Sequence, residues 1–436
     1  MTSLQVDAGA SARARIAWRL LPFLFLLYVA NYLDRTNIAY ATLGMKGDLG
    51  LTDSVFGTAS GIFFIGYFAL QIPGALLVER WSARWLLALT LIAWGGLTTL
   101  NAFVHTAHQL YGARFLLGAA EAGFFPGVLL YLNYWYPAHR QSRAVALLLM
   151  AQPFSFVFGG PLSGAIMDHF AGASGLHDWQ WLFIIEAAPA VLLGILVLFR
   201  LDNGIESAAW LTPEEKQLLR DRLAQDAVRK ADVPLRALFA MPAMWLFIAI
   251  LFCIVTGVYG INFWLPTMIS ATGIKSVLTI GLITAACYFT SAVVSVLVTR
   301  HAERVNEKRW HAAGAAVIGG LSLALSTTWT DSTLLTAVLL TIATTGALVA
   351  TALFWSFPGS LLTGTGVATG LAVINSCGNL GGFVGPYMLG LLTTWLGSRT
   401  AGVGLLGAFM ICAGVLIALA CRRYGLREHP HPAGRT

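Results

Sequence analysis

Charged residues are scarce in this chain: only 11% of its 436 residues are Asp, Glu, Lys or Arg, whereas 57% are hydrophobic. A soluble globular domain usually carries about 25% charged residues. The low charge therefore argues against a soluble enzyme or binding module and predicts a membrane protein. Apolar runs of about 20 residues recur along the whole length, and each is long enough to cross a hydrocarbon core of about 30 Å.

Several features of enzymes and receptors are also missing. The sequence shows no nucleophile with a plausible base, no phosphate-binding glycine loop and no large soluble domain. The five cysteines lie in expected spans without metal-ligand spacing, so we interpret them as packing residues. They are Cys253, Cys287, Cys377, Cys412 and Cys421. We therefore expect no enzyme activity, no metal and no cofactor.

The apolar runs predict twelve transmembrane helices, six on either side of a charged stretch. We expect them near residues 16–42, 56–78, 86–104, 109–136, 144–167, 179–201, 242–270, 276–299, 310–328, 333–356, 366–395 and 401–421. The predicted fold class is an all-α polytopic membrane protein made of two pseudo-symmetric six-helix bundles, as in many secondary transporters.

The expected domains follow from this division. They are an N-terminal bundle at 1–201, a cytoplasmic linker at 202–241, a C-terminal bundle at 242–422 and a cytoplasmic tail at 423–436. Within the linker, Thr212-Pro213-Glu214-Glu215 supplies an N-cap, a proline in the first turn and a capping-box acid. This pattern predicts a surface helix that begins near Pro213.

The basic residues predict the orientation. Of the 27 lysines and arginines, 22 fall in loops and tails that share one side if both termini are cytoplasmic. Cytoplasmic loops of membrane proteins carry such an excess of Lys and Arg. The net charge of +7 therefore needs no nucleic-acid partner. Short loops and the lack of a glycosylation sequon favour a bacterial inner (plasma) membrane.

A charged loop is repeated in the two halves. Glu79-Arg80 followed by Arg84 is echoed by Glu303-Arg304 followed by Lys308-Arg309, which supports an internal duplication. We interpret Glu79, Arg80 and Arg84 as a candidate ionic latch that gates neighbouring helices. Ordinary anchoring by basic residues at helix ends is the alternative interpretation.

Four charges lie inside apolar runs, where each costs about 2.5–3.5 kcal/mol and usually serves a function. They are Asp34, Arg35, Arg114 and Glu121. Arg114 and Glu121 are seven residues apart and so face the same way, whereas Asp34 points about 100° away from Arg35. Tyr32 shares a helical stripe with Arg35. We expect the four charges to form one site; a purely structural quartet is the alternative.

The charge count of this quartet predicts coupling. The site is neutral when empty, and it becomes neutral again only when a carboxylate and a proton are added together. Arg35 and Arg114 suit the carboxylate, because guanidinium groups grip it bidentately. Glu121 is the favoured proton carrier and Asp34 the second choice. For Glu186, a third acid in the spans, we expect a structural hydrogen bond.

Further polar residues are candidates for lining a cavity. Asn375 and Asn379 are four apart in a glycine-rich span, although asparagines there can also simply bridge helices. Tyr67 shares a face with Gln71, and Trp355 is another candidate substrate contact.

Three stretches of the sequence resemble a known protein family. They are Asn31-Tyr32-Leu33-Asp34-Arg35-Thr36-Asn37-Ile38, the run Arg114 to Gly127, and the run Ile374 to Pro386. Over nearly its whole length the chain resembles the major facilitator superfamily, and within it the anion:cation symporters. That family includes tartrate, phthalate and galactonate permeases.

The resemblance implies proton-coupled uptake of an organic anion by alternating access. It ties Asp34, Arg35, Arg114 and Glu121 to coupling and anion recognition, and it places polar contacts at Tyr67, Gln152 and the two asparagines. Glu79 and Ser82 depart from the superfamily loop, which usually has aspartate and glycine there. The resemblance also implies a monomer.

Other functions stay open at this stage. A proton-antiporting exporter of a drug or metabolite is the main alternative, which two buried arginines disfavour because they repel cationic solutes. An uncoupled facilitator or channel is a second alternative function. The substrate class is not fixed either: nearby aromatic side chains permit an aromatic acid, and the amides permit a hydroxy acid or a sugar acid.

Overall fold

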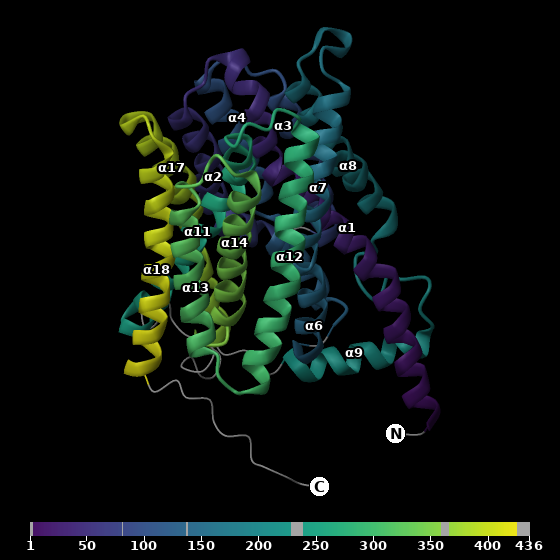
Figure 1. Cartoon of the computed structure of the whole chain (residues 1–436). Coiled ribbons are helices and arrows are strands. Elements are labelled where there is room, and N and C mark those ends of the chain that lie inside the picture. Colours follow the sequence, from purple (N-terminus) through teal and green to yellow (C-terminus); the bar gives the residue numbers. More distant parts are fainter. Residues whose placement is uncertain (1–2, 81, 137, 228–238, 359–365, 425–436) are drawn as a thin grey trace. The chain divides into compact units, whose positions relative to one another are not determined.

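Long helices make up most of the protein (Figure 1). The computed structural model describes residues 3–80, 82–136, 138–227, 239–358 and 366–424, and within these ranges every regular element is helical. These helices account for the twelve predicted spans, three of which are interrupted. The predicted all-α membrane fold is therefore confirmed.

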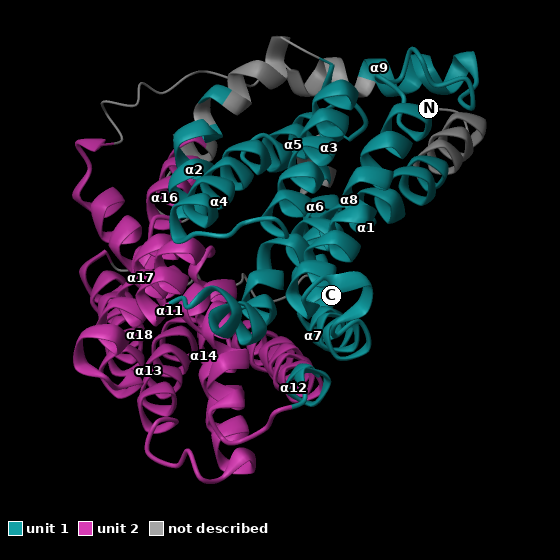
Figure 2. Ribbon diagram, turned by 90° about the horizontal axis from the view of Figure 1, so that it is seen from above, with its two compact units in different colours: residues 1–51, 62–230, 276–281 teal, residues 52–61, 231–275, 282–436 magenta. Residues whose placement is uncertain are grey.

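The chain divides into two compact units, which Figure 2 shows in teal and magenta. Unit 1 comprises Met1–Leu51, Ile62–Lys230 and Ser276–Gly281, and unit 2 comprises the remainder. Because this division passes through α2 and α12, the domain boundaries expected at residues 201 and 242 stay a prediction.

Unit 1 contains the helices of the first six spans and the linker helix. They are α1 (Ser3–Leu49), most of α2 (Asp53–Arg80), α3 (Ala83–Asn101), α4 (Ala107–Glu121), α5 (Phe124–Asn133), α6 (Ala138–Leu149), α7 (Ala151–His169), the short 3-10 helix η1 (Ala173–Gly175), α8 (Asp178–Arg200) and α9 (Pro213–Ala227). Helix α1 packs against α7 and α8, and α3 packs against α4, α5 and α8.

Unit 2 contains the helices of the last six spans. They are α11 (Pro242–Ser270), most of α12 (Val277–Arg304), α13 (Arg309–Leu325), α14 (Thr333–Phe354), α16 (Gly366–Gly378), α17 (Gly381–Leu396) and α18 (Arg399–Arg423). Helix α13 packs against α14 and α18, and α11 packs against α14, α16, α17 and α18. Buried Phe247, Leu251 and Phe354 belong to the apolar core of this unit.

Three predicted spans are broken into two helices each, at Ala122–Gly123, at Met150 and at Asn379–Leu380. Prolines explain the first two breaks, because Pro126 and Pro153 have no backbone N–H to donate to the carbonyl four residues earlier. Glycines flank the third break. The spans predicted at 109–136, 144–167 and 366–395 are therefore present, each as two consecutive helices.

The linker forms the predicted surface helix, α9. The Glu215 N–H donates to the Thr212 hydroxyl over 3.3 Å, and the Thr212 N–H donates to the Glu215 carboxylate over 3.0 Å, which is the predicted capping box. Hydrogen bonds from its own backbone N–H and from Thr212 lower the pKa of Glu214. Glu215 also forms an ion pair with Arg15 of α1.

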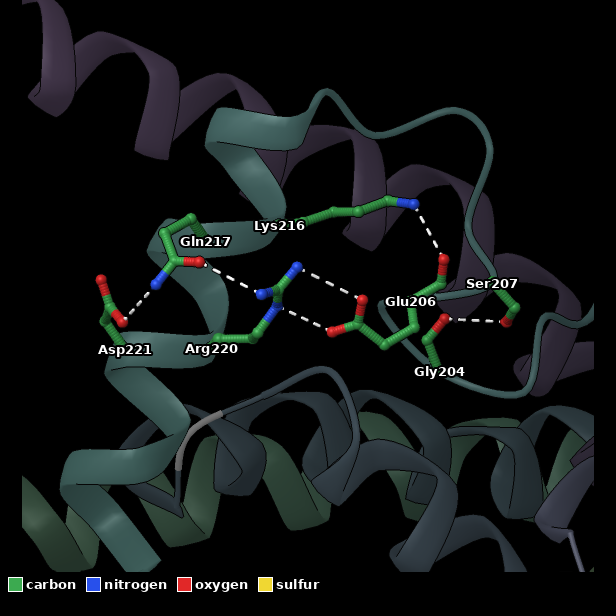
Figure 3. Close-up of polar contacts among 7 residues, drawn as sticks. All are labelled: Gly204, Glu206, Ser207, Lys216, Gln217, Arg220 and Asp221. Atoms are coloured by element: carbon green, nitrogen blue, oxygen red, sulfur yellow. Dashed lines mark hydrogen bonds and ion pairs between the residues drawn. The ribbon is translucent and has the colours of Figure 1, made fainter.

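Polar contacts hold α9 to the loop before it (Figure 3). The Arg220 guanidinium forms an ion pair with Glu206 at 2.7 Å, and the Lys216 ammonium donates to the Glu206 carbonyl over 2.8 Å. These contacts are largely exposed and therefore contribute little stability each.

Glycines let α2 and α4 approach closely inside unit 1. A Cβ atom added at Gly118 would lie 1.9 Å from the carbonyl oxygen of Phe63, and one added at Gly66 would lie 2.1 Å from that of Phe115. A methyl group at either position would push the two backbones apart. This approach places the side chains of α4 against those of α2, which matters for the site.

Candidate functional site

Helix α1 presents two adjacent charges to two different neighbours. Because successive residues of a helix point about 100° apart, Asp34 and Arg35 diverge. Asp34 is 2% exposed, and its Oδ2 accepts a hydrogen bond of 2.8 Å from the Trp94 indole N–H of α3. The Arg35 guanidinium instead forms an ion pair with Glu121 of α4.

Aromatic rings surround the Arg35 guanidinium. Its central carbon lies 5.4 Å from the ring centre of Tyr32, 5.3 Å from that of Phe63 and 5.5 Å from that of Tyr67. Such contacts attract a cation to the ring faces and add to the ion pair with Glu121. The Arg35 side chain is 11% exposed and that of Glu121 is 2% exposed.

The second arginine shares one ring with the first. The Arg114 guanidinium is fully buried and lies 5.2 Å from the ring centre of Phe63. It is within electrostatic range of Arg35 and of Asp34. The close approach of α2 and α4 holds Phe63 beside Arg114. The structure thus brings the four predicted charges together inside unit 1.

A third acid lies next to this group. Glu186 of α8 is 3% exposed and accepts a hydrogen bond of 2.6 Å from the Ser163 hydroxyl of α7, as expected for a structural contact. Glu186 also acts electrostatically on Asp34. The sequence did not indicate this neighbourhood.

The other predicted residues are placed less directly. Gln152 is partly buried near the start of α7. Asn375, Asn379 and Trp355 belong to unit 2, where the Asn379 N–H donates to the Asn375 carbonyl over 2.9 Å. Of the candidate gate, Arg84 lies in the first turn of α3, whereas the side chains of Glu79 and Arg80 lie outside the described residues.

Three residues of the site were missed from the sequence. Phe63 stacks under both arginines, Trp94 donates to Asp34, and Ser163 donates to Glu186. An apolar ring in an apolar run carries no sequence signal, so Phe63 could not have been singled out. An indole donor in a span is a weak signal, since a buried Trp N–H usually finds a partner.

The described part of the chain contains no group of three or more His, Cys, Asp or Glu side chains arranged to hold a metal ion. The site itself offers two guanidinium groups, three carboxyl groups and the tyrosine rings around Arg35.

Sequence comparisons agree with this picture. The sequence pattern of the Major Facilitator Superfamily matches residues 24–386. The metabolite transport protein NicT of Pseudomonas putida is 39% identical over 421 residues, covering 96% of each chain. A protein of Agrobacterium vitis named as a tartrate transporter is 40% identical over 418 residues, covering 95% of this chain and 92% of its own. A quinolone resistance transporter of Acinetobacter baumannii is 36% identical over 402 residues, covering 91% and 92%.

Solved structures share the fold at low identity. A D-xylose-proton symporter matches with a TM-score of 0.73 at 15% identity, covering 96% of this chain and 99% of that one. A bacterial homologue of the lysosomal transporter Spinster matches with a TM-score of 0.72 at 16% identity, covering 94% and 98%. Because the family pattern spans most of the chain and full-length relatives are transport proteins, the chain belongs to the Major Facilitator Superfamily and is a multi-pass membrane transporter rather than an enzyme.

Proposed function

We propose that this transporter takes up an organic carboxylate together with a proton. The observation that carries the proposal is the pair of arginines that share the Phe63 ring, with Glu121 bound to one of them. Two guanidinium groups provide an anion site, because each offers a planar fork of donors that matches a carboxylate.

The ion pair gives the coupling a physical route. A carboxylate substrate that binds Arg35 competes with Glu121 for the same guanidinium. Once displaced, the Glu121 carboxylate is left buried without its cation, which is costly unless it takes up a proton. Anion binding and proton binding therefore favour each other. Asp34 is the second candidate for the proton, because a carboxylate bound to Arg114 would weaken the stabilisation that this cation gives to ionised Asp34.

The remaining roles rest on the sequence. Tyr32 and Tyr67 line Arg35 and are proposed to contact the substrate, and so are Gln152, Asn375, Asn379 and Trp355. Glu79, Arg80 and Arg84 are proposed to act in gating. We propose that the protein is a monomer in the inner membrane. Both termini then lie in the cytoplasm.

Tartrate is the first substrate to test. Two relatives from Agrobacterium vitis, at 39% and 40% identity, are named as tartrate transporters. Tartrate carries two carboxylates, which suits the two arginines and, by the same charge count, calls for two protons. It also carries two hydroxyl groups, which suit tyrosine and amide partners. The proposed substrate class is thus a small hydroxylated carboxylate.

Export is the second candidate function. The observation that favours it is the relative of Acinetobacter baumannii named as a quinolone resistance transporter. An exporter of this kind would move its substrate against the proton instead of with it. The direction of proton movement separates the two functions.

The Glu121→Gln variant tests the coupling. In proteoliposomes with an acidic exterior we expect it to lose gradient-driven tartrate accumulation but to keep tartrate counterflow, because exchange of loaded forms needs no net proton movement. Glu215→Gln is the matched control, since Glu215 is another buried acid paired with an arginine but lies in the linker. Full accumulation by Glu121→Gln would remove Glu121 from the proposed role.

A further inference from the structure

Asp34 and Glu186 are two buried carboxyl groups near the Arg114 guanidinium. Asp34 comes from α1 and Glu186 from α8, and they are 2% and 3% exposed. The charged groups that act on Asp34 are Glu186 and Arg114. The other groups that face the two acids are neutral: Trp94 from α3, Ser163 from α7 and the Asn37 amide from α1.

Each acid has one oxygen that accepts a hydrogen bond and one that does not. Trp94 donates to Asp34 Oδ2 over 2.8 Å, and Ser163 donates to Glu186 Oε1 over 2.6 Å. Asp34 Oδ1 and Glu186 Oε2 are buried and make no hydrogen bond of normal geometry among the described residues, although the Asn37 amide lies close enough to act on Glu186 as a donor. A buried ionised oxygen without a donor is strongly disfavoured. A protonated oxygen would supply the missing hydrogen itself.

The charge count leads to the same conclusion. Arg35 is neutralised by Glu121 in the observed ion pair. This leaves the Arg114 guanidinium to balance both Asp34 and Glu186, and the remaining sum is −1 if both acids are ionised. Two carboxylates that share one buried environment do not both ionise readily, and one proton then belongs to the pair.

We propose that Asp34 and Glu186 form a proton-binding site that keeps one proton in the substrate-free transporter. This deepens the proposed function and rests on it only for the meaning of the proton in transport. With the resident proton in place, Asp34, Arg35, Arg114, Glu121 and Glu186 together carry no net charge at rest. The proton that travels with the substrate is then a second one, taken up when the carboxylate displaces Glu121 from Arg35.

Infrared difference spectroscopy of the purified, substrate-free protein at pH 7 tests the resident proton directly. A protonated carboxyl group has a C=O band that is separate from the carboxylate bands and shifts in heavy water. We expect one such band in the wild-type protein and its loss in Glu186→Gln, because Asp34 is then left to pair with Arg114 as a carboxylate. Asp34→Asn should lose the same band, because Glu186 is then left as the carboxylate that balances Arg114. Agreement between the two variants excludes poor folding of one of them as the cause of the loss.

Glu215→Gln is the matched control, because Glu215 is buried but ion-paired with Arg15 and contributes no protonated band. It should keep the wild-type band. A wild-type protein without the band, or a band that persists in both Glu186→Gln and Asp34→Asn, would overturn the inference. A band that disappears when sodium ions are added at constant pH would also overturn it, because the site would then be a sodium site.

The test separates this inference from the proposed function. A wild-type protein that shows the band but never accumulates a carboxylate in response to a pH gradient would contradict the proposed function and leave the resident proton supported. A wild-type protein that accumulates tartrate but lacks the band would contradict the resident proton and leave the proposed function supported.

Discussion

Arg114 of α4 is fully buried beside the Phe63 ring, where the planar geometry of its guanidinium group matters as much as its positive charge. We expect Arg114→Lys to lower tartrate uptake at subsaturating substrate by at least tenfold, equivalent to about 1.4 kcal/mol. An ammonium group keeps the charge but cannot grip a carboxylate through two parallel donors, and it is more strongly hydrated. The measurement is the initial rate of uptake into proteoliposomes.

A conservative change elsewhere serves as its control. Arg220→Lys alters an exposed pair with Glu206 on the linker helix, where an ion pair contributes about 0–1 kcal/mol. Uptake by this variant should stay at the wild-type level. Equal activity of Arg114→Lys and Arg220→Lys would contradict a role for Arg114 in binding the substrate.

Trp94 fixes one oxygen of Asp34, so its removal should cost stability. Trp94→Phe keeps most of the ring volume but leaves Asp34 Oδ2 without its donor, which costs about 1–3 kcal/mol when the group is buried. The expected result is a lower unfolding temperature in detergent. Trp85→Phe, at an exposed position in the same helix, should leave the unfolding temperature unchanged.

At the residue scale, the sequence predicted the direction in which each charged side chain points better than it predicted which residue that side chain contacts. Helical geometry alone showed that Asp34 and Arg35 point to different neighbours and that Arg114 and Glu121 face the same way. Which side chain meets Arg35 depends on where the fold places α4 relative to α1, and the local sequence does not indicate this placement. Glu121, Phe63 and Glu186 therefore acquired their neighbours only in the folded chain. The binding roles of Gln152, Asn375, Asn379 and Trp355 stay predictions.

At the scale of elements, the contact between α2 and α4 positions the site. Gly118→Ala should abolish most transport, because its Cβ would lie 1.9 Å from the Phe63 carbonyl oxygen and must push α2 away from α4. Gly112→Ala is a matched control in the same helix, where an added Cβ meets nothing within 4 Å. Similar uptake by the two variants would show that the spacing of α2 and α4 does not matter for the site.

Asp168 caps the start of α12 inside unit 1. Its carboxylate accepts hydrogen bonds from the Ser276 hydroxyl at 2.9 Å and from the N–H groups of Val277 and Leu278 at 3.2 and 3.1 Å. Asp168 belongs to α7 and caps α12 from a neighbouring helix, so Asp168→Ala should lower the free energy of unfolding by about 0.5–2 kcal/mol, as the loss of an N-cap side chain does. Thermal unfolding measures this loss, and an unchanged unfolding temperature would contradict the capping role.

The elements themselves were mostly readable from the sequence. Twelve apolar runs predicted the spans, and the capping box predicted the start of α9. The ends were less accurate, because helices continue past the apolar run: α1 extends from Ser3 to Leu49 although its run suggested 16–42. The breaks near Pro126 and Pro153 were missed because hydropathy does not record a lost backbone donor.

At the scale of the whole molecule, the basic residues predict both termini in the cytoplasm. A protease-cleavable tag at the C-terminus should therefore resist protease added to right-side-out vesicles and be cleaved in inverted ones. The same tag placed in the loop near Lys275, which the charge bias assigns to the outside, is the control and should behave in the opposite way. Cleavage of the C-terminal tag from outside would reverse the predicted topology.

The fold of the whole chain could be predicted from its sequence because apolar runs, a charged linker and basic loops all repeat over hundreds of residues. The substrate could not, because a few side chains in unit 1 decide it and solved structures with this fold share only about 15% identity with the chain. The relatives named as tartrate transporters narrow the choice for experiment.

The central claim is that a carboxylate and a proton enter together, and the internal pH of proteoliposomes tests it most directly. Vesicles with a trapped pH indicator, the same pH on both sides and a clamped membrane potential receive external tartrate. The account predicts that the lumen acidifies as tartrate enters and that Glu121→Gln vesicles show no acidification. An alkaline shift of the lumen, or tartrate entry without any change in pH, would contradict the account.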